Sequence, residues 1–265
     1  MALKFYWRGE SATFGAEDYS AGDTTPTGSN LTYGTDGAKI GTNGLIGAAS
    51  VSSNASFTAT DILANTADVD TAVGSAGYWW KQETTLGGNG LVHGFRIYSN
   101  NTTKAFDVMT TTGGKLSLWC RNVVVEALQI TVPTAISADT WYFVVVRWDV
   151  PNDKMKLEIY TDAGGSTTAL LDEIEATSGV AAVVNSTDFG ASAFTLLQWN
   201  VKASSSGRAF SDNMMLSDNY DAPLQNNAFI TDYANYSESV GQPTRSRARG
   251  IPGMNNIGSR FGRGW

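Results

Sequence analysis

The chain has 265 residues, of which 42% are hydrophobic and only 16% are charged, and its formal net charge is −7. This size allows one large or two small globular domains, and the 28 glycines favour a turn-rich β protein over a helical one. The single cysteine, Cys120, and the single histidine, His93, exclude an intramolecular disulfide and a zinc site made of cysteine and histidine.

The predicted strands follow one another from the N-terminus. The first is "LKFYWR", and residues 20–56, rich in glycine, serine, threonine and asparagine, are expected to form loops or edge strands. Alternating apolar residues predict strands at "ASFTATDI", "GYWWKQET" and "LVHGFRIYS", whereas "NTADVDTAVGSAG" is expected to be a loop. Three more strands are predicted in "AFDVMTTTGGKLSLWCRNVVVEALQITV".

Tryptophan and cysteine side chains on these strands are expected to pack mainly in the core. Cys120 shares a strand phase with Leu116 and Leu118, so we expect a buried, inert thiol. Trp79 and Trp80 are adjacent and must point to opposite faces of a strand, so one of them is a candidate for an exposed ring that stacks on a sugar. Core packing accounts for most of the others, which are Trp119, Trp141, Trp148 and Trp199.

A strong hairpin is predicted in residues 139–162, "DTWYFVVVRWDVPNDKMKLEIYTD". In its first half, every second residue from Tyr142 to Val150 is apolar, and these residues form one face of a strand. The residues between them form the opposite face, which is apolar until Arg147, so this strand is expected to be covered on both sides at its start. Pro-Asn-Asp is a turn sequence, and strict alternation after it predicts a half-buried strand whose charged face carries Lys156 and Glu158.

Beyond this hairpin, "TTALLDEIEA" is ambiguous, and "FTLLQWNVKA" with "GRAFSDNMMLSD" predicts a closing strand pair. About ten strands at short spacing, without a convincing amphipathic helix, favour an all-β sandwich or barrel. We therefore expect one β domain over residues 1–225 and an extended C-terminal tail, rich in glycine and arginine, over residues 226–265.

Three of these segments resemble the laminin-G-like branch of the concanavalin A-like lectin/glucanase superfamily. They are "GYWWKQET", "ADTWYFVVVRWDVPNDKMKLEIYTDAGG", and "FTLLQWN" followed by "GRAFSDNMMLSD", in which Asp212 precedes an alternating apolar strand. The resemblance covers about residues 36–220 and consists of core patterns, not catalytic motifs. It implies a two-sheet antiparallel jelly roll and, because some relatives bind sugars or calcium, possible glycan partners.

No set of residues typical of catalysis is found, so no enzyme activity is expected. Glycan hydrolysis needs two carboxylates at a fixed separation, and the Glu-x-Asp-x-x-Glu pattern of laminarinase-like relatives is missing. The acidic string at Asp172, Glu173 and Glu175 is interpreted as a solvated strand edge, and His93 needs no catalytic role.

No cofactor is expected, and calcium is the one metal for which ligands of the right kind gather. Asp212, Asn213 and Asp218 lie in "SDNMMLSDNYDA" and offer the oxygen ligands that calcium prefers, without a diagnostic spacing. The alternative interpretation is that these side chains cap turns.

Charge is distributed unevenly along the chain. The last 21 residues carry +5 and no acidic side chain, which leaves −12 on the rest. An acidic body attracts such a tail, whereas its few arginines would make few phosphate contacts, so nucleic acid is not expected as a partner. The assembly residues predicted in this tail are Arg245, Arg247, Arg249, Arg260, Phe261, Arg263 and Trp265.

These features favour a non-enzymatic subunit of a large homo-oligomeric assembly. The leading hypothesis is a phage virion surface protein (a capsid decoration, spike or fibre component) whose tail docks to neighbouring subunits. The alternative is a carbohydrate-binding, lectin-like module that recognises surface glycans. The N-terminus "MALKFYWRGE" has no apolar core, so neither a signal peptide nor a membrane location is expected.

Overall fold

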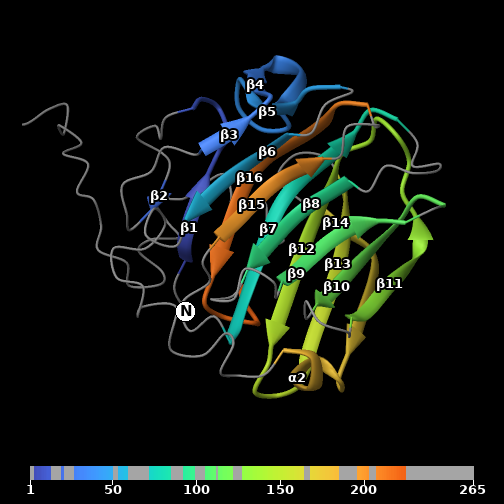
Figure 1. The fold of residues 1–265 in the computed structure, drawn as a ribbon. Coiled ribbons are helices and arrows are strands. Elements are labelled where there is room, and N and C mark those ends of the chain that lie inside the picture. The colour runs from blue at the N-terminus through green and yellow to red at the C-terminus, as the bar shows by residue number, and fades with distance from the viewer. Residues whose placement is uncertain are drawn as a thin grey trace, which may run out of the picture.

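The computed structural model is nearly all β and consists of two antiparallel sheets packed face to face (Figure 1). This confirms the all-β, two-sheet sandwich expected from the sequence. The structure describes residues 3–12, 19–20, 27–49, 53–58, 72–84, 92–98, 105–111, 113–121, 127–163, 168–184, 196–202 and 207–224. The predicted tail, 226–265, lies outside these ranges.

The first sheet has nine described strands in the order β14-β13-β12-β7-β16-β1-β2, with β5 pairing with β16 and β4 pairing with β5. Their bounds are β1 (Leu3–Trp7), β2 (Tyr19–Ser20), β4 (Leu31–Gly34), β5 (Gly44–Gly47), β7 (Val73–Gln82), β12 (Tyr142–Asp149), β13 (Lys154–Asp162), β14 (Thr168–Ala176) and β16 (Ala209–Ser217).

The second sheet has seven described strands in the order β11-β10-β9-β8-β15-β6-β3. Their bounds are β3 (Thr27–Ser29), β6 (Ser53–Thr58), β8 (Val92–Tyr98), β9 (Ala105–Thr110), β10 (Lys115–Arg121), β11 (Ala127–Ala135) and β15 (Leu196–Lys202). Two short helical turns, η1 (Thr35–Gly37) and α2 (Val180–Val183), complete the described elements. No helix in these parts of the chain is long and apolar enough to cross a membrane.

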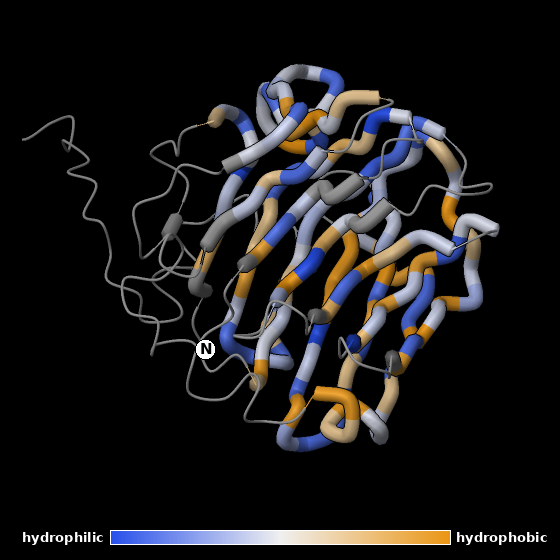
Figure 2. Tube along the Cα trace, viewed as in Figure 1, coloured by the Kyte–Doolittle hydropathy of each residue, from blue (hydrophilic) through white to orange (hydrophobic). Residues whose placement is uncertain are grey.

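The core lies between the two sheets because each strand turns one phase of its alternating side chains inward, and Figure 2 shows hydrophobic and hydrophilic residues interleaved along the strands. Aromatic rings join the layers: Trp148 of β12 stacks on Phe106 of β9 with ring centroids 5.6 Å apart, and Phe5 stacks on Trp199 at 5.0 Å. Each such contact adds about 0.5–1.5 kcal/mol beyond simple burial.

The predicted hairpin is confirmed. β12 and β13 pair antiparallel from Tyr142↔Thr161 to Asp149↔Lys154, and both faces of β12 are buried. Asp153 in the turn has a φ of 59° and accepts N–H bonds from Gly179 and Ala181, which ties the turn to α2. The charged face of β13 is less solvated than predicted, because Glu158 is buried.

One local prediction is wrong. The segment expected to be a loop before "YWW" becomes part of β7 from Val73, because its small residues lie under large rings: a Cβ on Gly74 would come within 2.5 Å of Trp148 Cζ2. Core packing of most tryptophans is confirmed, and Trp119 is not among those in the core: it is half-buried and lies on the outer face, on the strand phase opposite that of Leu118 and Cys120.

Candidate functional site

The outer face of the nine-stranded sheet carries a second apolar cluster that two irregular segments help to cover. Segment 36–42 follows β4, and segment 218–224 follows the last described strand, β16. The cluster consists of Tyr6, Trp79, Phe143, Val145, Tyr160, Met215, Ala222 and Leu224, with Ile40 and Trp141 packed against it. Trp79, a candidate for an exposed sugar-binding ring, is therefore fully buried, and Trp80 is buried in the main core.

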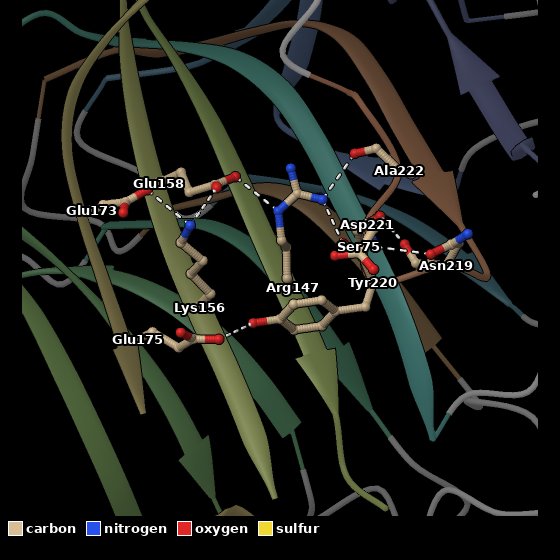
Figure 3. Close-up of polar contacts among 10 residues, drawn as sticks. All are labelled: Ser75, Arg147, Lys156, Glu158, Glu173, Glu175, Asn219, Tyr220, Asp221 and Ala222. Carbon is tan, nitrogen blue, oxygen red and sulfur yellow. Dashed lines mark hydrogen bonds and ion pairs between the residues drawn. The ribbon is translucent and has the colours of Figure 1, made fainter. Parts of the chain in front are cut away.

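The chain that leaves β16 is attached to this face by a buried ion pair (Figure 3). The Arg147 guanidinium donates through Nε to Glu158 Oε2 at 2.8 Å, and both side chains are only 5% exposed. Through Nη1 it donates to the carbonyl oxygens of Tyr220 at 2.5 Å and Ala222 at 2.8 Å. One arginine thus binds both the sheet and the segment that crosses it. We call this arrangement the tail anchor, and it also includes the hydrogen bonds of Ser75 and Tyr220 that are described next.

Further contacts hold both ends of the tail anchor (Figure 3). Ser75 Oγ of β7 donates to the Asn219 carbonyl at 2.7 Å, and the Tyr220 hydroxyl donates to Glu175 of β14 at 2.6 Å. Burial, followed by the charge and hydrogen bond of Glu175, raises the pKa of the Tyr220 hydroxyl well above its ordinary value. The hydroxyl therefore stays a proton donor throughout the neutral range.

Lys156 extends the ionic network across β13 to the sheet edge. Its ammonium lies 2.9 Å from Glu158 Oε1 and 2.8 Å from Glu173 Oε2. Although burial acts to lower the pKa of Lys156, the two glutamates outweigh it, and the pKa is raised. A chain of alternating charges therefore runs from the buried Arg147 to the exposed edge strand β14.

A second buried carboxylate organises segment 36–42. Asp212 of β16 accepts backbone N–H bonds from Lys39 and Ile40 through Oδ2, each at 2.7 Å, and from Asn213 through Oδ1 at 2.9 Å. Asn213 has a φ of 48° at a bulge, and its Oδ1 accepts the hydroxyl of Tyr6. Burial raises the pKa of the Asp212 carboxyl to about 8, even though its three N–H partners and Arg8 act in the opposite direction.

The structure places two of the three calcium candidates in the buried interior and the third beyond the end of β16. Asp212 and Asn213 are buried and bonded to protein groups, and Asp218 follows the end of β16, about 20 Å further along the strand direction. Among the residues that the structure describes, no three His, Cys, Asp or Glu side chains form a metal-binding group. The arginines and aromatic residues predicted in the tail lie outside the described ranges, and of His93 only its place in β8 is described.

The outer face of the seven-stranded sheet is polar, in contrast to the other sheet. Side chains from six strands form one cross-sheet row, and the strand pairings fix the order as Ser56, Gln198, Arg96, Asp107, Trp119 and Gln129. Arg96 donates to Asp107 through Nε at 3.1 Å and Nη2 at 2.8 Å, and to the Tyr98 hydroxyl at 2.9 Å.

Trp119 and Arg121 form the aromatic part of this polar row. The Arg121 guanidinium lies 4.7 Å from the centroid of the Trp119 ring, and its Nε lies 3.9 Å from the buried Asp107. The indole N–H of Trp119 and the Nε of Arg121 are buried, and neither finds a hydrogen-bond partner within the described ranges. Two guanidinium groups therefore share one carboxylate, which leaves a surplus positive charge on this face.

Sequence reasoning missed both arrangements. The sequence predicts that the apolar cover of the first strand ends at Arg147 and that Glu158 lies on the charged face of a half-buried strand. Neither pattern reveals the burial of this pair, because Arg147 is covered by a segment some 70 residues further along the chain. The face of Trp119 could have been assigned, since Leu116, Leu118 and Cys120 already occupied the inward phase.

No protein-family model and no curated protein matches the sequence. Among solved structures, the chain is similar to the binding domains of botulinum neurotoxin serotype D/C (10% identity, TM-score 0.53) and serotype C1 (10% identity, TM-score 0.52). In both cases the match covers 87% of this chain and 52% of the other, so the chain spans about half the length of those domains.

A further similarity is to the full-length tailspike protein 2 of an Escherichia coli O157:H7 bacteriophage, with 12% identity, 81% of this chain and 28% of the other covered, and a TM-score of 0.49. At these identities the two neurotoxin matches, whose TM-scores exceed 0.5, show the two-sheet, jelly-roll-like fold alone.

Arg147→Leu is expected to destabilise the protein by about 3–5 kcal/mol, because it leaves Glu158 and two carbonyl oxygens without their buried donor. Urea unfolding followed by tryptophan fluorescence measures the loss. Arg208→Leu is the matched control: this arginine forms exposed ion pairs with Asp36 and Glu83, and its loss should cost under about 1 kcal/mol. Equal effects of the two variants would contradict the assigned role.

Asp212 should make stability depend on pH. Because its folded-state pKa of about 8 exceeds the unfolded value, the folded protein holds the proton more tightly, so its stabilising contribution is complete below about pH 4 and is lost as pH rises toward 8. The free energy of unfolding of the wild type should therefore fall, relative to that of Asp212→Asn, over this interval. Urea unfolding of both proteins across the interval measures the difference, and a difference that stays constant or grows with pH would refute the expectation.

Proposed function

We propose that this protein is a non-enzymatic structural and adhesion subunit of a large assembly, in which a rigid sandwich is fastened to neighbouring copies by the chain beyond Leu224. The observation that carries the proposal is the tail anchor. A buried arginine, which is costly to remove from water, is used to fix the backbone at Tyr220 and Ala222 just before that chain begins. A load on the tail would therefore meet the sheet first at Arg147 of β12.

Charge and chemistry support the same role. The last 21 residues carry +5 and the rest carries −12, so the tail of one copy is attracted to the body of another. The acidic pair Glu173 and Glu175 bonds Lys156 and Tyr220, which is a structural use of carboxylates. A virion surface is the setting that we propose, with the protein as a capsid decoration, spike or fibre component of the laminin-G-like, concanavalin A-like superfamily.

Deletion of residues 225–265 tests this function. The full chain should form oligomers that weaken as salt rises, because the attraction is between opposite charges, whereas the chain ending at Leu224 should be a monomer. Sedimentation velocity at several protein and salt concentrations measures both. An unchanged melting temperature is the control for the integrity of the sandwich. A full chain that stays monomeric, or a shortened chain that still assembles, would reject the proposal.

A second candidate function, glycan recognition, is favoured by the polar row on the seven-stranded sheet. A half-buried Trp119, with Arg121 over its ring and Gln129 and Asp107 on the neighbouring strands, combines an aromatic surface with planar hydrogen-bonding groups, as saccharide recognition requires. The surplus positive charge of the row suits a sugar that bears a carboxylate.

A glycan array probed with the full chain tests this second candidate. Binding should be lost in Trp119→Ala and weakened in Arg121→Ala, while Arg208→Ala, on the other sheet, should bind as the wild type does. A parallel array with a chelator tests whether saccharide binding depends on calcium. Absence of saccharide binding by the wild type, or binding that survives in Trp119→Ala, would remove this candidate site.

A further inference from the structure

The edge strand β14, which the sequence predicted to be a solvated edge, exposes apolar side chains. Among the described strands it pairs only with β13 and so ends the nine-stranded sheet. Leu170 is 50% exposed and Leu171 is 37% exposed, and these are the large hydrophobic residues that the described surface leaves open. An edge with exposed apolar residues is a template for another strand.

The outer face of β14 carries Leu170 and two carboxylates, those of Glu173 and Glu175. The register with β13 sets Leu170 opposite Tyr160, Glu173 opposite Glu158 and Glu175 opposite Lys156, so all three lie on the outer face. A bulge at Leu171 separates the apolar part from the acidic part. Asp172 instead accepts the N–H of Thr134 in β11 at 2.7 Å, which turns it toward the other sheet.

The chain itself contains a segment with the complementary pattern. Residues 245–251 read "RSRARGI", so in an extended strand three arginines and then an isoleucine would share one face. Their spacing of two residues equals the spacing of Glu173 and Glu175 on β14. Pro252, which cannot donate to a strand ladder, would end the pairing.

We propose that residues 245–251 of a second copy add to the β14 edge as an antiparallel strand. With Arg249 opposite Glu173, Arg247 falls opposite Glu175, and Ile251 falls beside Leu170 and Leu171. A parallel strand that keeps both charge pairs would instead place Arg245 beside the leucines, so the antiparallel direction is the one that matches charge and apolar surface together. Backbone hydrogen bonds would supply affinity, and these side chains would set the register.

This inference rests on the proposed assembly function and names its docking surface. Because a tail of one copy binds an edge of another, two copies can exchange tails in a closed pair, or successive copies can form rings or filaments. The 20 residues between Leu224 and Arg245 can span up to about 70 Å, so the tail can also reach the edge of its own chain. The experiment must therefore separate exchange between copies from docking within one copy.

Two charge-reversed full-length proteins make that separation. The tail variant carries Arg245→Glu, Arg247→Glu and Arg249→Glu, and the edge variant carries Glu173→Lys and Glu175→Lys. Each alone should self-associate at least about tenfold more weakly than the wild type, because opposite-charge pairs become like-charge pairs. Mixed in equal amounts they should associate again, since the arginine tail of one finds the acidic edge of the other. Sedimentation velocity with one partner fluorescently labelled measures each case.

The possible outcomes are distinct. Recovery of association in the mixture supports exchange of the strand between copies, whereas a mixture that stays monomeric overturns it in favour of docking within one chain. Variants that each assemble as the wild type does would overturn the β14 site and leave the assembly function standing, whereas a wild type that never assembles rejects both. Because the edge substitutions touch Lys156 and Tyr220, Leu170→Ser provides a second edge variant that leaves the ionic network intact and should also weaken association.

Discussion

The organisation of this protein depends on one buried guanidinium. Arg147 lies on a central strand, 5% exposed, where an unpaired charge would cost several kcal/mol. Its forked donors are used in two directions: Nε binds Glu158 on the neighbouring strand, and Nη1 binds two carbonyl oxygens of the segment after β16. A lysine could not serve both directions with the same fixed geometry. The arginine is stable there only while that segment covers it, so the sheet and the segment depend on each other.

The two outer faces of the sandwich differ because of this arrangement. On the nine-stranded sheet, side chains such as Phe143 and Met215 make the outer face apolar, and segments 36–42 and 218–224 help to bury it. On the seven-stranded sheet the outward phase consists largely of polar and charged residues, and Trp119 remains half-buried without a covering strand among the described residues. The covered apolar face and the polar face therefore lie on opposite sides of one core.

Much of the fold follows from local pattern, whereas the site does not. Strict alternation in residues 154–159 and a doubly apolar strand before it were sufficient to predict β12 and β13, since inward phases of period two define a sandwich core. The burial of Glu158 could not be predicted in this way, because an alternating strand does not reveal what crosses it later in the chain. The start of β7 was missed for a related reason: Gly74 has no side chain to mark a strand, and its role becomes visible only against Trp148.

Glu175 links the tail anchor with the sheet edge. It accepts the hydroxyl of Tyr220 at 2.6 Å, and it stands on β14 two residues from Glu173, which binds Lys156. A cation arriving at this edge would compete with Tyr220 and Lys156 for the same carboxylates, so binding at the edge and fixing of the segment beyond β16 are coupled through shared acceptors. Such coupling works in both directions: if a bound cation weakens the Tyr220 contact, then that contact weakens binding of the cation by the same free energy.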